Sequence, residues 1–276
     1  MAGSIVDRRG ALLGGAAGAG LGVWGAVAPS AASAAGIDTR VALAAALDAY
    51  AATRVGRVGL MLRDNRDGGY FAWRPLTLQS LSTIKVLILV ATLKRAQDRN
   101  LALTATQKSL ASRMIRNSDN AATDTLLAQI GVSTCQRVAD QLGMSSTVVR
   151  GGSTGWWGYS TTTTRDLVQL MNQLVLGTYL TVGRRDYVRG LMGTVSTSQQ
   201  WGLGDPLPDT VHVEQKNGWG PMSTGYRVNC FGYVSGSGRN YQVAILSRSP
   251  NGFTYGKATV NRVSRIVFDA LDRPLT

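Results

Sequence analysis

The residues best placed to perform chemistry are Ser82 and Lys85, in the segment LSTIKVLILV. Residues three apart on a helix share a face, so the lysine amine can reach the serine hydroxyl. At a helix N-terminus the dipole and the free backbone N–H groups favour a developing negative charge. The apolar residues that follow offer burial, which lowers a lysine pKa and makes the amine a usable base. The pair indicates an activated serine, although the same residues could simply begin a buried helix.

Two further motifs follow the first along the chain. Ser118-Asp119-Asn120 precedes a helical pattern, and Lys216-Asn217-Gly218 ends a strand pattern. Taken singly, the three motifs could be two helix caps and a strand end. In this order, however, they form the set used by enzymes that acylate a serine beside a lysine. The combination therefore favours chemistry over capping.

The sequence lacks the residues of most other hydrolytic sites. Its one histidine, His212, lies in a strand pattern, where a lone histidine is usually structural, and no nucleophile elbow accompanies it. No His, Cys, Asp and Glu residues have metal-ligand spacing, and the phosphate-binding loop G-x-x-x-x-G-K-[ST] is absent. We therefore expect neither a metal nor a cofactor, and a serine–lysine mechanism remains.

The hydrophobic pattern indicates how these motifs are positioned. Alternation predicts five strands, at residues 57–63, 70–74, 211–215, 228–234 and 242–247. Helical spacing predicts helices at residues 39–53, about 82–97 and 259–271, and a mostly helical stretch from 104 to about 180. Strands at both ends with helices between them predict an α/β (α+β) fold. Its antiparallel sheet is formed from both termini, and the helices make a second lobe.

The first 34 residues have the pattern of an export signal. Arg8-Arg9 precedes a weakly apolar stretch, and Ala32-Ser33-Ala34 ends a run of small residues. The paired arginines suggest the twin-arginine route. A transmembrane anchor is the alternative, but the stretch is short and rich in glycine. We expect cleavage near residue 34, a secreted or cell-envelope location, and a single domain over residues 35–276.

The net charge and the cysteine content limit which binding partners and which disulfide the sequence allows. The net charge of +13 comes from scattered arginines, and no segment interleaves basic and aromatic residues as nucleic-acid sites do. We expect no nucleic-acid partner and attribute the charge to solubility and to attraction for anionic cell-wall polymers or lipid. Cys135 and Cys230 could pair outside the cytoplasm, but the sequence does not show whether they meet. We expect a monomer.

The three motifs carry a resemblance to the class A β-lactamase-like serine hydrolases, in the superfamily of serine β-lactamases and penicillin-binding proteins. SLSTIKVL resembles the nucleophile helix, SDNAATDTLLAQIG the second motif and its helix, and TTTTRDLVQLM the helix after the Ω-loop. The resemblance extends over essentially all of the chain after the export signal. It implies a sheet lobe and a helical lobe with the site between them.

The resemblance implies a role for each matching residue. Ser82 would be the acylated nucleophile and Lys85 its general base. Ser118 would relay a proton to the leaving nitrogen, and Asn120 would hold the substrate amide. The backbone N–H groups of Ser82 and Trp219 would form the oxyanion hole.

Four more residues would face the substrate. Lys216 would attract a substrate carboxylate, with Asn217 and Gly218 beside it, and Arg227 could pair with a carboxylate through its guanidinium fork. The third motif departs from the family, because it reads K-N-G where the family has K-T-G or K-S-G. An amide thus replaces a carboxylate-binding hydroxyl.

The largest departure is a missing carboxylate. Class A enzymes carry an Ω-loop glutamate that activates the water for release of the acyl-enzyme, whereas the one glutamate here, Glu214, precedes Lys216 on a strand. Between the second motif and residue 161 the only carboxylates are Asp124 and Asp140, both in predicted helices. The Ω-loop segment is short and rich in aromatics. The stretch between the first two motifs is also short, which should widen the site.

We expect an exported serine acyl-hydrolase that acts through acyl-Ser82 on a β-lactam, a D-Ala-D-Ala-type peptide or another acyl compound. Loss of a positioned base costs about 10²–10⁴ in rate, so the acyl-enzyme should persist. Two alternatives remain open. One is a D,D-peptidase or special-purpose acyltransferase, for which Trp156, Trp157 and Trp219 could form an apolar wall unless they only pack the core. The other is a degenerate protein that binds cell-wall or acyl ligands.

Overall fold

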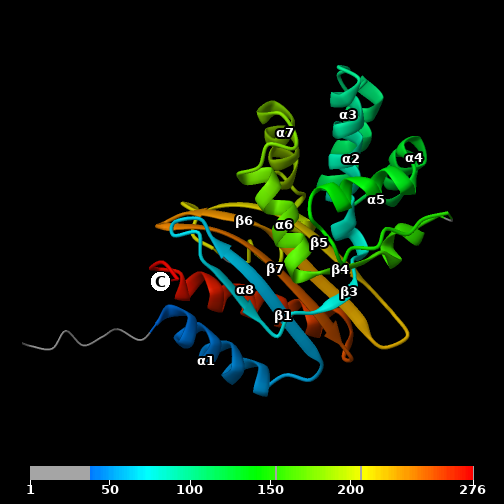
Figure 1. The fold of residues 1–276 in the computed structure, drawn as a ribbon. Helices are drawn as coiled ribbons and strands as arrows, with labels where there is room; N and C mark the ends of the chain where they lie inside the picture. Colours follow the sequence, from blue (N-terminus) through cyan, green and yellow to red (C-terminus); the bar gives the residue numbers. More distant parts are fainter. Residues whose placement is uncertain (1–37, 153, 206, 276) are drawn as a thin grey trace, which may run out of the picture. The chain divides into compact units, whose positions relative to one another are not determined.

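The computed structural model describes residues 38–152, 154–205 and 207–275 (Figure 1). Five strands form one antiparallel sheet in the order β2-β1-β7-β6-β5. Their bounds are β1 Arg57–Asp64, β2 Tyr70–Trp73, β5 His212–Gly220, β6 Tyr226–Gly236 and β7 Arg239–Ser249. Strands from both ends of the described chain therefore share the sheet, which confirms the predicted fold class. The predicted signal peptide and its cleavage site lie outside the described residues.

Two helices cover one face of the sheet and the remaining helices lie on the other (Figure 1). The first face carries α1 (Thr39–Ala52) and α8 (Gly252–Ala270). The second lobe contains α2 Ile84–Asp98, α3 Ala105–Arg116, α4 Asn120–Ile130, α5 Val132–Gln141, α6 Thr164–Val175 and α7 Val182–Met192. A short ladder of β3 (Thr77–Gln79) and β4 (Thr161–Thr163) adjoins this lobe.

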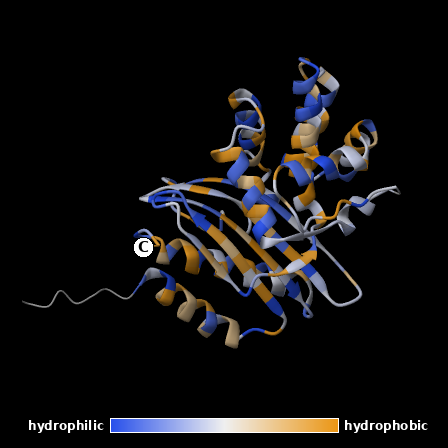
Figure 2. Cartoon of the chain, viewed as in Figure 1, coloured by the Kyte–Doolittle hydropathy of each residue, from blue (hydrophilic) through white to orange (hydrophobic). Residues whose placement is uncertain are grey.

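Each face of the sheet has its own hydrophobic core. Leu60, Val243 and Ile245 pack with α1 and α8, whereas Phe231 and Leu246 pack with the helical lobe. This division follows from the period of two in a strand, which sends successive side chains to opposite faces. Figure 2 shows the resulting apolar segments along the strands and helices. Burial on both faces makes the central strands a rigid base for the residues they carry.

The helix that carries Lys85 is buried on all sides. Its residues from Ile84 to Leu93 are all buried, which confirms the prediction of a helix through the core. It begins later than predicted, because a 3₁₀ turn, η1 (Leu81–Thr83), precedes it. The Thr83 hydroxyl donates to the Ser80 carbonyl at 2.7 Å, and this bond holds the tighter turn.

The structure extends several predicted elements. β5, β6 and β7 are each longer than their apolar patterns indicated, and α8 begins at Gly252 rather than at residue 259. Residues with weak helix propensity occupy the first turns of α8. Packing of Gly256 against Val228 and Ser249, which leaves no room for a Cβ, stabilises them as helix.

The two cysteines lie in different cores and do not pair. Cys135 is in the helical-lobe core and Cys230 in the core under α1 and α8; both are buried and free. Burial raises the pKa of each thiol to about 12. Neither thiol is therefore a reactive group at neutral pH. Among the described residues, no helix combines the length and apolarity needed to cross a membrane.

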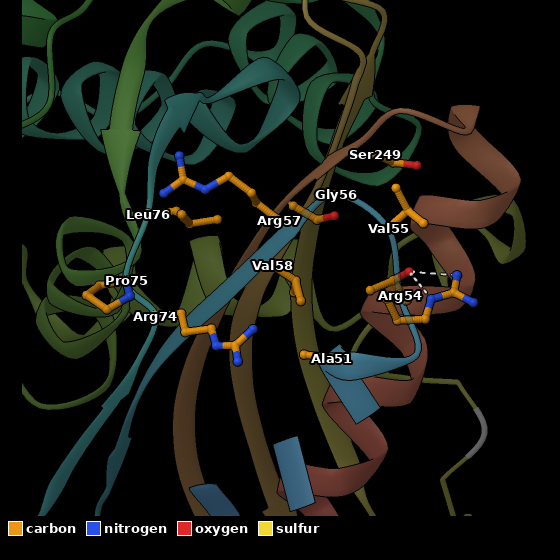
Figure 3. Close-up of a pocket in the computed structure, with 12 residues that line it drawn as sticks. Ala51, Arg54, Val55, Gly56, Arg57, Val58, Arg74, Pro75, Leu76 and Ser249 are labelled. Carbon is orange, nitrogen blue, oxygen red and sulfur yellow. Dashed lines mark hydrogen bonds between the residues drawn. The ribbon is translucent and has the colours of Figure 1, made fainter. Parts of the chain in front are cut away.

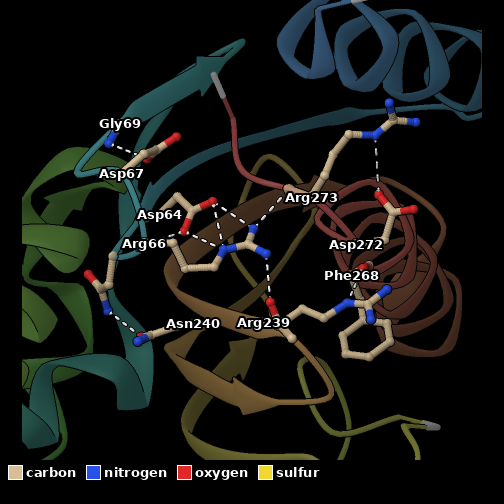
Figure 4. A network of polar contacts seen from close by, with 11 residues as sticks. Asp64, Arg66, Asp67, Gly69, Arg239, Asn240, Phe268, Asp272 and Arg273 are labelled. Atoms are coloured by element: carbon tan, nitrogen blue, oxygen red, sulfur yellow. Dashed lines mark hydrogen bonds and ion pairs between the residues drawn. The ribbon is translucent and has the colours of Figure 1, made fainter. Parts of the chain in front are cut away.

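A polar cluster connects the β1–β2 turn, the β6–β7 turn and the C-terminal residues (Figure 4). The Asp64 carboxylate is fully buried and accepts two parallel bonds from Arg66, at 3.0 and 2.7 Å. Arg66 also donates to the carbonyl oxygens of Gly238 at 2.6 Å and Arg273 at 2.9 Å. One arginine thus neutralises a buried charge and ties three segments together.

Arg66→Ala should lower the free energy of unfolding by about 3 kcal/mol, because it leaves the buried Asp64 carboxylate without its cation. For a domain of this size that corresponds to a melting temperature about 6–12 °C lower. Thermal denaturation of the wild type and the variant measures this difference in melting temperature. Arg262→Ala, at an exposed position on α8, is the control and should change stability by less than about 0.5 kcal/mol. Equal effects of the two variants would contradict the role assigned to Arg66.

Candidate active site

The candidate nucleophile lies on a strained turn. Ser82 is half-buried in η1, and its hydroxyl makes no hydrogen bond within the described part of the chain. Leu81, directly before it, has a backbone φ of 50°, a left-handed conformation that residues other than glycine rarely adopt. Such strain costs about 1–3 kcal/mol and is common at functional sites. The turn presents the Ser82 hydroxyl instead of using it as a cap.

Lys85 is buried beside the second motif. Its Nζ donates to the Ser118 carbonyl at 2.6 Å and to Asn120 Oδ1 at 2.8 Å, and lies 3.2 Å from Ser118 Oγ. Burial and, to a smaller extent, the charge of Lys216 lower the pKa of this amine to about 6. At neutral pH most of the amine is uncharged. Because two N–H groups bond the carbonyl and the amide oxygen, a lone pair remains to accept a hydroxyl proton.

Lys216 reaches the same hydroxyl from the sheet. Its Nζ donates to Ser118 Oγ at 3.1 Å and to the Asn217 carbonyl at 3.0 Å. Burial also lowers its pKa, to about 7, so it retains more positive charge than Lys85 near neutral pH. Ser118 Oγ therefore lies between a neutral amine and a cation. Ser118 itself has a backbone φ of 58° and is, after Leu81, a second residue in a strained conformation near these amines.

The strand that carries Lys216 approaches the nucleophile turn very closely at Gly218. A Cβ at this position would lie 2.7 Å from the Ser80 carbonyl and 2.9 Å from the Ser82 nitrogen. Only glycine permits this approach, which places the backbone of β5 beside the Ser82 N–H. The oxyanion hole expected from the N–H groups of Ser82 and Trp219 stays a prediction, and the close approach at Gly218 is where it can be tested.

Gly218→Ala should slow acylation of Ser82 about 10²–10³-fold, because the added methyl pushes the Ser82 N–H away from the strand. It should also cost about 1–3 kcal/mol of stability through overpacking. The rate of adduct formation measures the effect on acylation, and thermal denaturation measures the effect on stability. Gly183→Ala in α7, where a Cβ meets no atom within 4 Å, is the matched control and should leave the acylation rate unchanged. Unaltered acylation in Gly218→Ala would argue against this oxyanion hole.

The structure does not bring Asn217 to the substrate face. Its Nδ2 donates to the carbonyls of Gln199 at 2.8 Å and Trp201 at 3.0 Å, and the side chain is buried. Neighbouring residues on a strand point to opposite faces, so Asn217 turns away where Lys216 and Gly218 face the site. The expectation that this amide replaces a carboxylate-binding hydroxyl is therefore corrected. Asn120, in contrast, is exposed and lies against Lys85.

Arg227 lies on β6 and bonds Gln79 of β3, and each of its three guanidinium nitrogens already donates one hydrogen bond. It donates to Gln79 Oε1 at 2.8 Å, Thr224 Oγ1 at 2.8 Å and the Gly225 carbonyl at 3.1 Å. Burial and the charge of Arg248 lower its pKa. Arg227 thus positions the segment before Ser82, and a substrate carboxylate would have to compete with these partners.

The three tryptophans named from the sequence do not form one wall. Trp219 packs its ring on Trp201, with centroids 5.8 Å apart, and Trp156 is 54% exposed. Trp157 is buried, with its ring 4.5 Å from Lys85 Nζ. An indole face attracts a cation without offering a base.

Asp124 holds Trp157 in place, a contact that we did not predict. The Asp124 Oδ1 accepts from Trp157 Nε1 at 2.7 Å and from the Gly155 N–H at 3.0 Å. One sequence signal was available, because Asp124 lies four residues after Asn120 and shares its face of α4. The Asp124 carboxylate, whose charge raises the pKa of Lys85, is thus engaged in positioning an indole.

The remaining candidates are structural. His212 Nε2 lies 3.2 Å from Glu214 Oε1, and Glu214 accepts two bonds from Arg189, each of 2.9 Å. Asp119 caps α4 by accepting the Ala122 N–H at 2.9 Å, and this bond is the main cause of the lowered pKa of its carboxyl. The described residues contain no cluster of potential metal ligands.

Residues 103–271 match the model of the β-lactamase enzyme family, and this region includes the second and third motifs. The chain belongs to this family. Among curated protein sequences, none matches the chain. Membership agrees with the resemblance read from the three motifs and identifies a β-lactamase-like hydrolase fold.

Solved structures show the same fold over most of the chain. A class A β-lactamase representative from Bacteroides cellulosilyticus has 19% identity and a TM-score of 0.76, covering 85% of this chain and 98% of its own. PBP-A has 22% identity and a TM-score of 0.74, covering 84% and 96%. A class A β-lactamase from Mycobacterium abscessus has 22% identity and a TM-score of 0.72, covering 84% and 100%. At these sequence identities the structural similarity establishes only that the chain has the class A β-lactamase fold.

Proposed function

We propose that the protein is a serine hydrolase that forms an acyl-Ser82 intermediate with β-lactams or with D-Ala-D-Ala-like amides. The observation that carries this proposal is the buried Lys85 amine. Its pKa is lowered to about 6, and it lies three residues from an unbonded serine hydroxyl in a helical turn. A purely structural lysine would be paired with a carboxylate, whereas this one bonds a carbonyl, an amide oxygen and a hydroxyl.

The proposed acylation uses the groups in sequence. Lys85 takes the proton of the Ser82 hydroxyl as Oγ forms a bond to the substrate carbonyl carbon. The N–H groups of Ser82 and Trp219 stabilise the oxyanion. Ser118 passes a proton to the leaving nitrogen as the C–N bond breaks, and Lys85 returns its proton to Ser118 through their 3.2 Å contact. Lys216 supplies the positive charge that attracts a substrate carboxylate.

Release of the acyl group is the slow half of the proposed reaction. The Ω-loop equivalent presents Trp157 to Lys85, and Asp124 is bonded to that loop. A variant of PBP-A, with 22% identity and a TM-score of 0.73, has been solved as an acyl-enzyme complex with penicillin G. This precedent for a trapped adduct on the same fold supports β-lactams as the probe.

A D,D-peptidase or acyltransferase is the second candidate, and the Trp157 contact favours the acyltransferase over enzymes that release the acyl group with water. An indole beside Lys85 hinders a hydrolytic water but leaves the Ser82 hydroxyl open to an acyl donor. Release of D-alanine from an acyl-D-Ala-D-Ala peptide, with transfer of the acyl group to an added amine, identifies this activity.

We also propose that the protein works outside the cytoplasm, after removal of residues 1–34, and that its net charge of +13 favours contact with anionic cell-wall polymer. Mass spectrometry of secreted protein should find an N-terminus near residue 35. Exported protein that retains Met1 would refute the cleavage.

The test of the function is an intact-mass measurement with penicillin G. The wild-type chain should gain one ring-opened penicillin, and peptide mapping should locate it on Ser82. Ser82→Ala should gain none, while keeping the wild-type melting temperature as evidence that it is folded. An adduct on the alanine variant would move the nucleophile elsewhere. No adduct and no hydrolysis by the wild type would support a degenerate binding protein instead.

A further inference from the structure

The chain reaches the nucleophile turn, residues 79–83, by crossing the face of the sheet that bears the helical lobe. At Gly59 on β1 a Cβ would lie 1.8 Å from the Arg74 carbonyl oxygen, so the crossing segment packs directly on the strand. Figure 3 shows Leu76, at the start of the crossing, on the side of β1 toward which the Arg57 side chain extends. In the described part of the chain, β3 then pairs with β4 alone. The backbone ladders of the large sheet therefore do not hold the nucleophile turn.

A side chain of the sheet bonds the turn instead. Asn229 on β6 is fully buried, and its Nδ2 donates to the Gln79 carbonyl at 2.9 Å and to the Ser80 carbonyl at 3.5 Å. In the strand register Asn229 lies opposite Gly218, the position at which β5 comes close to the same turn. Arg227 bonds only the side chain of Gln79, whereas Asn229 bonds the backbone. Gly218 thus lets the sheet approach the turn, and Asn229 fixes the turn to the sheet.

The amide of Asn229 also takes the place of a backbone partner within the sheet. The pairing of β6 with β7 includes Tyr226 and Arg227 and resumes at Cys230. In this gap Asn229 Oδ1 accepts the Ser247 N–H at 3.3 Å. A buried amide is costly unless its polar atoms are bonded, and here every bond goes to the backbone. An amide that interrupts a central strand pairing in this way indicates a role other than packing.

The turn needs an anchor because it is strained. Leu81 has a backbone φ of 50°, and a conformation of this kind persists only where the surrounding structure holds it. The Ser80 carbonyl, next to Leu81, accepts the Thr83 hydroxyl at 2.7 Å and the Thr83 N–H at 3.2 Å, but both donors belong to the turn itself. Its contact with Asn229 connects it to the sheet. Loss of this contact would let the turn relax toward an unstrained conformation.

We propose that Asn229 is a positioning residue for the acylation of Ser82. Its amide holds the backbone of residues 79–80, and this keeps the Ser82 N–H and hydroxyl in place beside β5. The inference rests on the proposed function, because it concerns the geometry in which acyl-Ser82 forms. A misplacement of about 1 Å costs about 10²-fold in rate. Asn229 bonds only backbone groups, so its loss should slow the reaction of bound substrate and leave substrate binding at Lys216 unchanged.

The test is the acylation rate of Asn229→Leu, in which the side chain keeps its branched shape and loses its hydrogen bonds. Intact-mass measurements over a range of penicillin G concentrations give the maximal rate and the half-saturating concentration separately. The maximal rate should fall about 10–10²-fold, and the half-saturating concentration should stay within about 2-fold of the wild type. Gln242→Met is the matched control, because it removes another fully buried amide, bonded to Asn65 Oδ1 at 3.0 Å. It should leave both acylation constants unchanged.

Asn229→Asp supplies a second readout, since it preserves the volume and makes the contact depend on protonation. An ionised carboxylate has no proton to donate to the Gln79 and Ser80 carbonyls, whereas the neutral carboxyl donates to one of them. Burial raises the pKa of such a carboxyl. The acylation rate of Asn229→Asp, divided by that of the wild type, should therefore rise about 5-fold or more between about pH 8 and pH 5. A merely structural role predicts a ratio that does not change with pH.

Three outcomes would overturn the positioning role. They are a wild-type maximal rate in Asn229→Leu, an equal loss of rate in Gln242→Met, and a ratio for Asn229→Asp that is independent of pH. The last decides the matter if Asn229→Leu does not fold. Each of these leaves the proposed function intact, because the wild type still forms its adduct. Absence of an adduct on the wild type would instead overturn the proposed function, and this inference with it.

Discussion

Replacing Lys85 with methionine should slow the acylation of Ser82 by penicillin G about 10²–10⁴-fold, because it removes the amine proposed to take the hydroxyl proton. Methionine fills nearly the same volume without an amine, so packing around α2 is preserved. The variant should be as stable as the wild type or more stable, since a desolvated amine has been removed from a fully buried position. The rate of adduct formation by intact mass, together with thermal denaturation, separates catalysis from packing.

The pH dependence of the wild-type acylation rate tests the same assignment. Acylation requires neutral Lys85, so the rate should rise with pH through about 6. It also requires charged Lys216 for the substrate carboxylate, so the rate should fall as pH passes about 7. The two amines share Ser118 Oγ and titrate as a pair, which makes the profile a bell with its maximum between these values. A rate that still rises beyond about pH 9 would show that Lys85 is protonated at neutral pH and is not the base.

The lowered pKa values of Lys85 and Lys216 also make the free energy of unfolding depend on pH. In the unfolded chain both lysines titrate near their ordinary pKa of 10.5, whereas folding lowers these values to about 6 and about 7. Between these limits the unfolded state binds more protons, so the free energy of unfolding should rise with pH from about 6 upward. The rise ends near pH 10.5, where the unfolded chain also gives up these protons. As pH falls, the gain is lost progressively across this window, and the loss is complete below about 6, where both amines carry charge in a buried site.

Much of the fold and part of the site follow from local patterns. The apolar run after Ser82 predicts a core helix because no surface helix is apolar on every side, and α2 is buried in that way. The family resemblance implied that Ser118 and Lys216 share a site with Lys85, and the Lys85 and Lys216 amines both bond the Ser118 hydroxyl. Motifs of this kind are readable because each needs a fixed local conformation.

The directions of single side chains were harder to predict. Asn217 follows Lys216, and strand alternation alone sends it to the other face, yet the motif comparison placed it beside the substrate. Trp157 lies in a segment with no periodicity, so its position above Lys85 depends on a long-range bond to Asp124. Contacts of this type depend on tertiary packing, which a pattern in the sequence does not encode.

Penicillin turnover by the wild type should show a burst of one equivalent followed by a much slower steady state. Acylation has its base, its proton relay and two backbone donors, each donor contributing about 10²–10³ in rate. Deacylation lacks a base for water, because Trp157 faces Lys85 at 4.5 Å and the Asp124 carboxylate is bonded to the indole and to Gly155. The steady-state rate should be about 10²–10⁴-fold below the burst rate. Stopped-flow hydrolysis with parallel intact mass measures both phases.

Trp157→Glu should raise the steady-state rate about 10²-fold, because it puts a carboxylate where the indole now meets Lys85. Trp157→Gln has nearly the same shape without a base and is the matched control, which should stay close to the wild-type rate. If the two variants turn over equally fast, removal of the indole rather than addition of a base is what admits the water. Many fast turnovers by the wild type with no adduct would show that Lys85 itself activates the water. The indole would then be a wall of the substrate site rather than the reason for slow release.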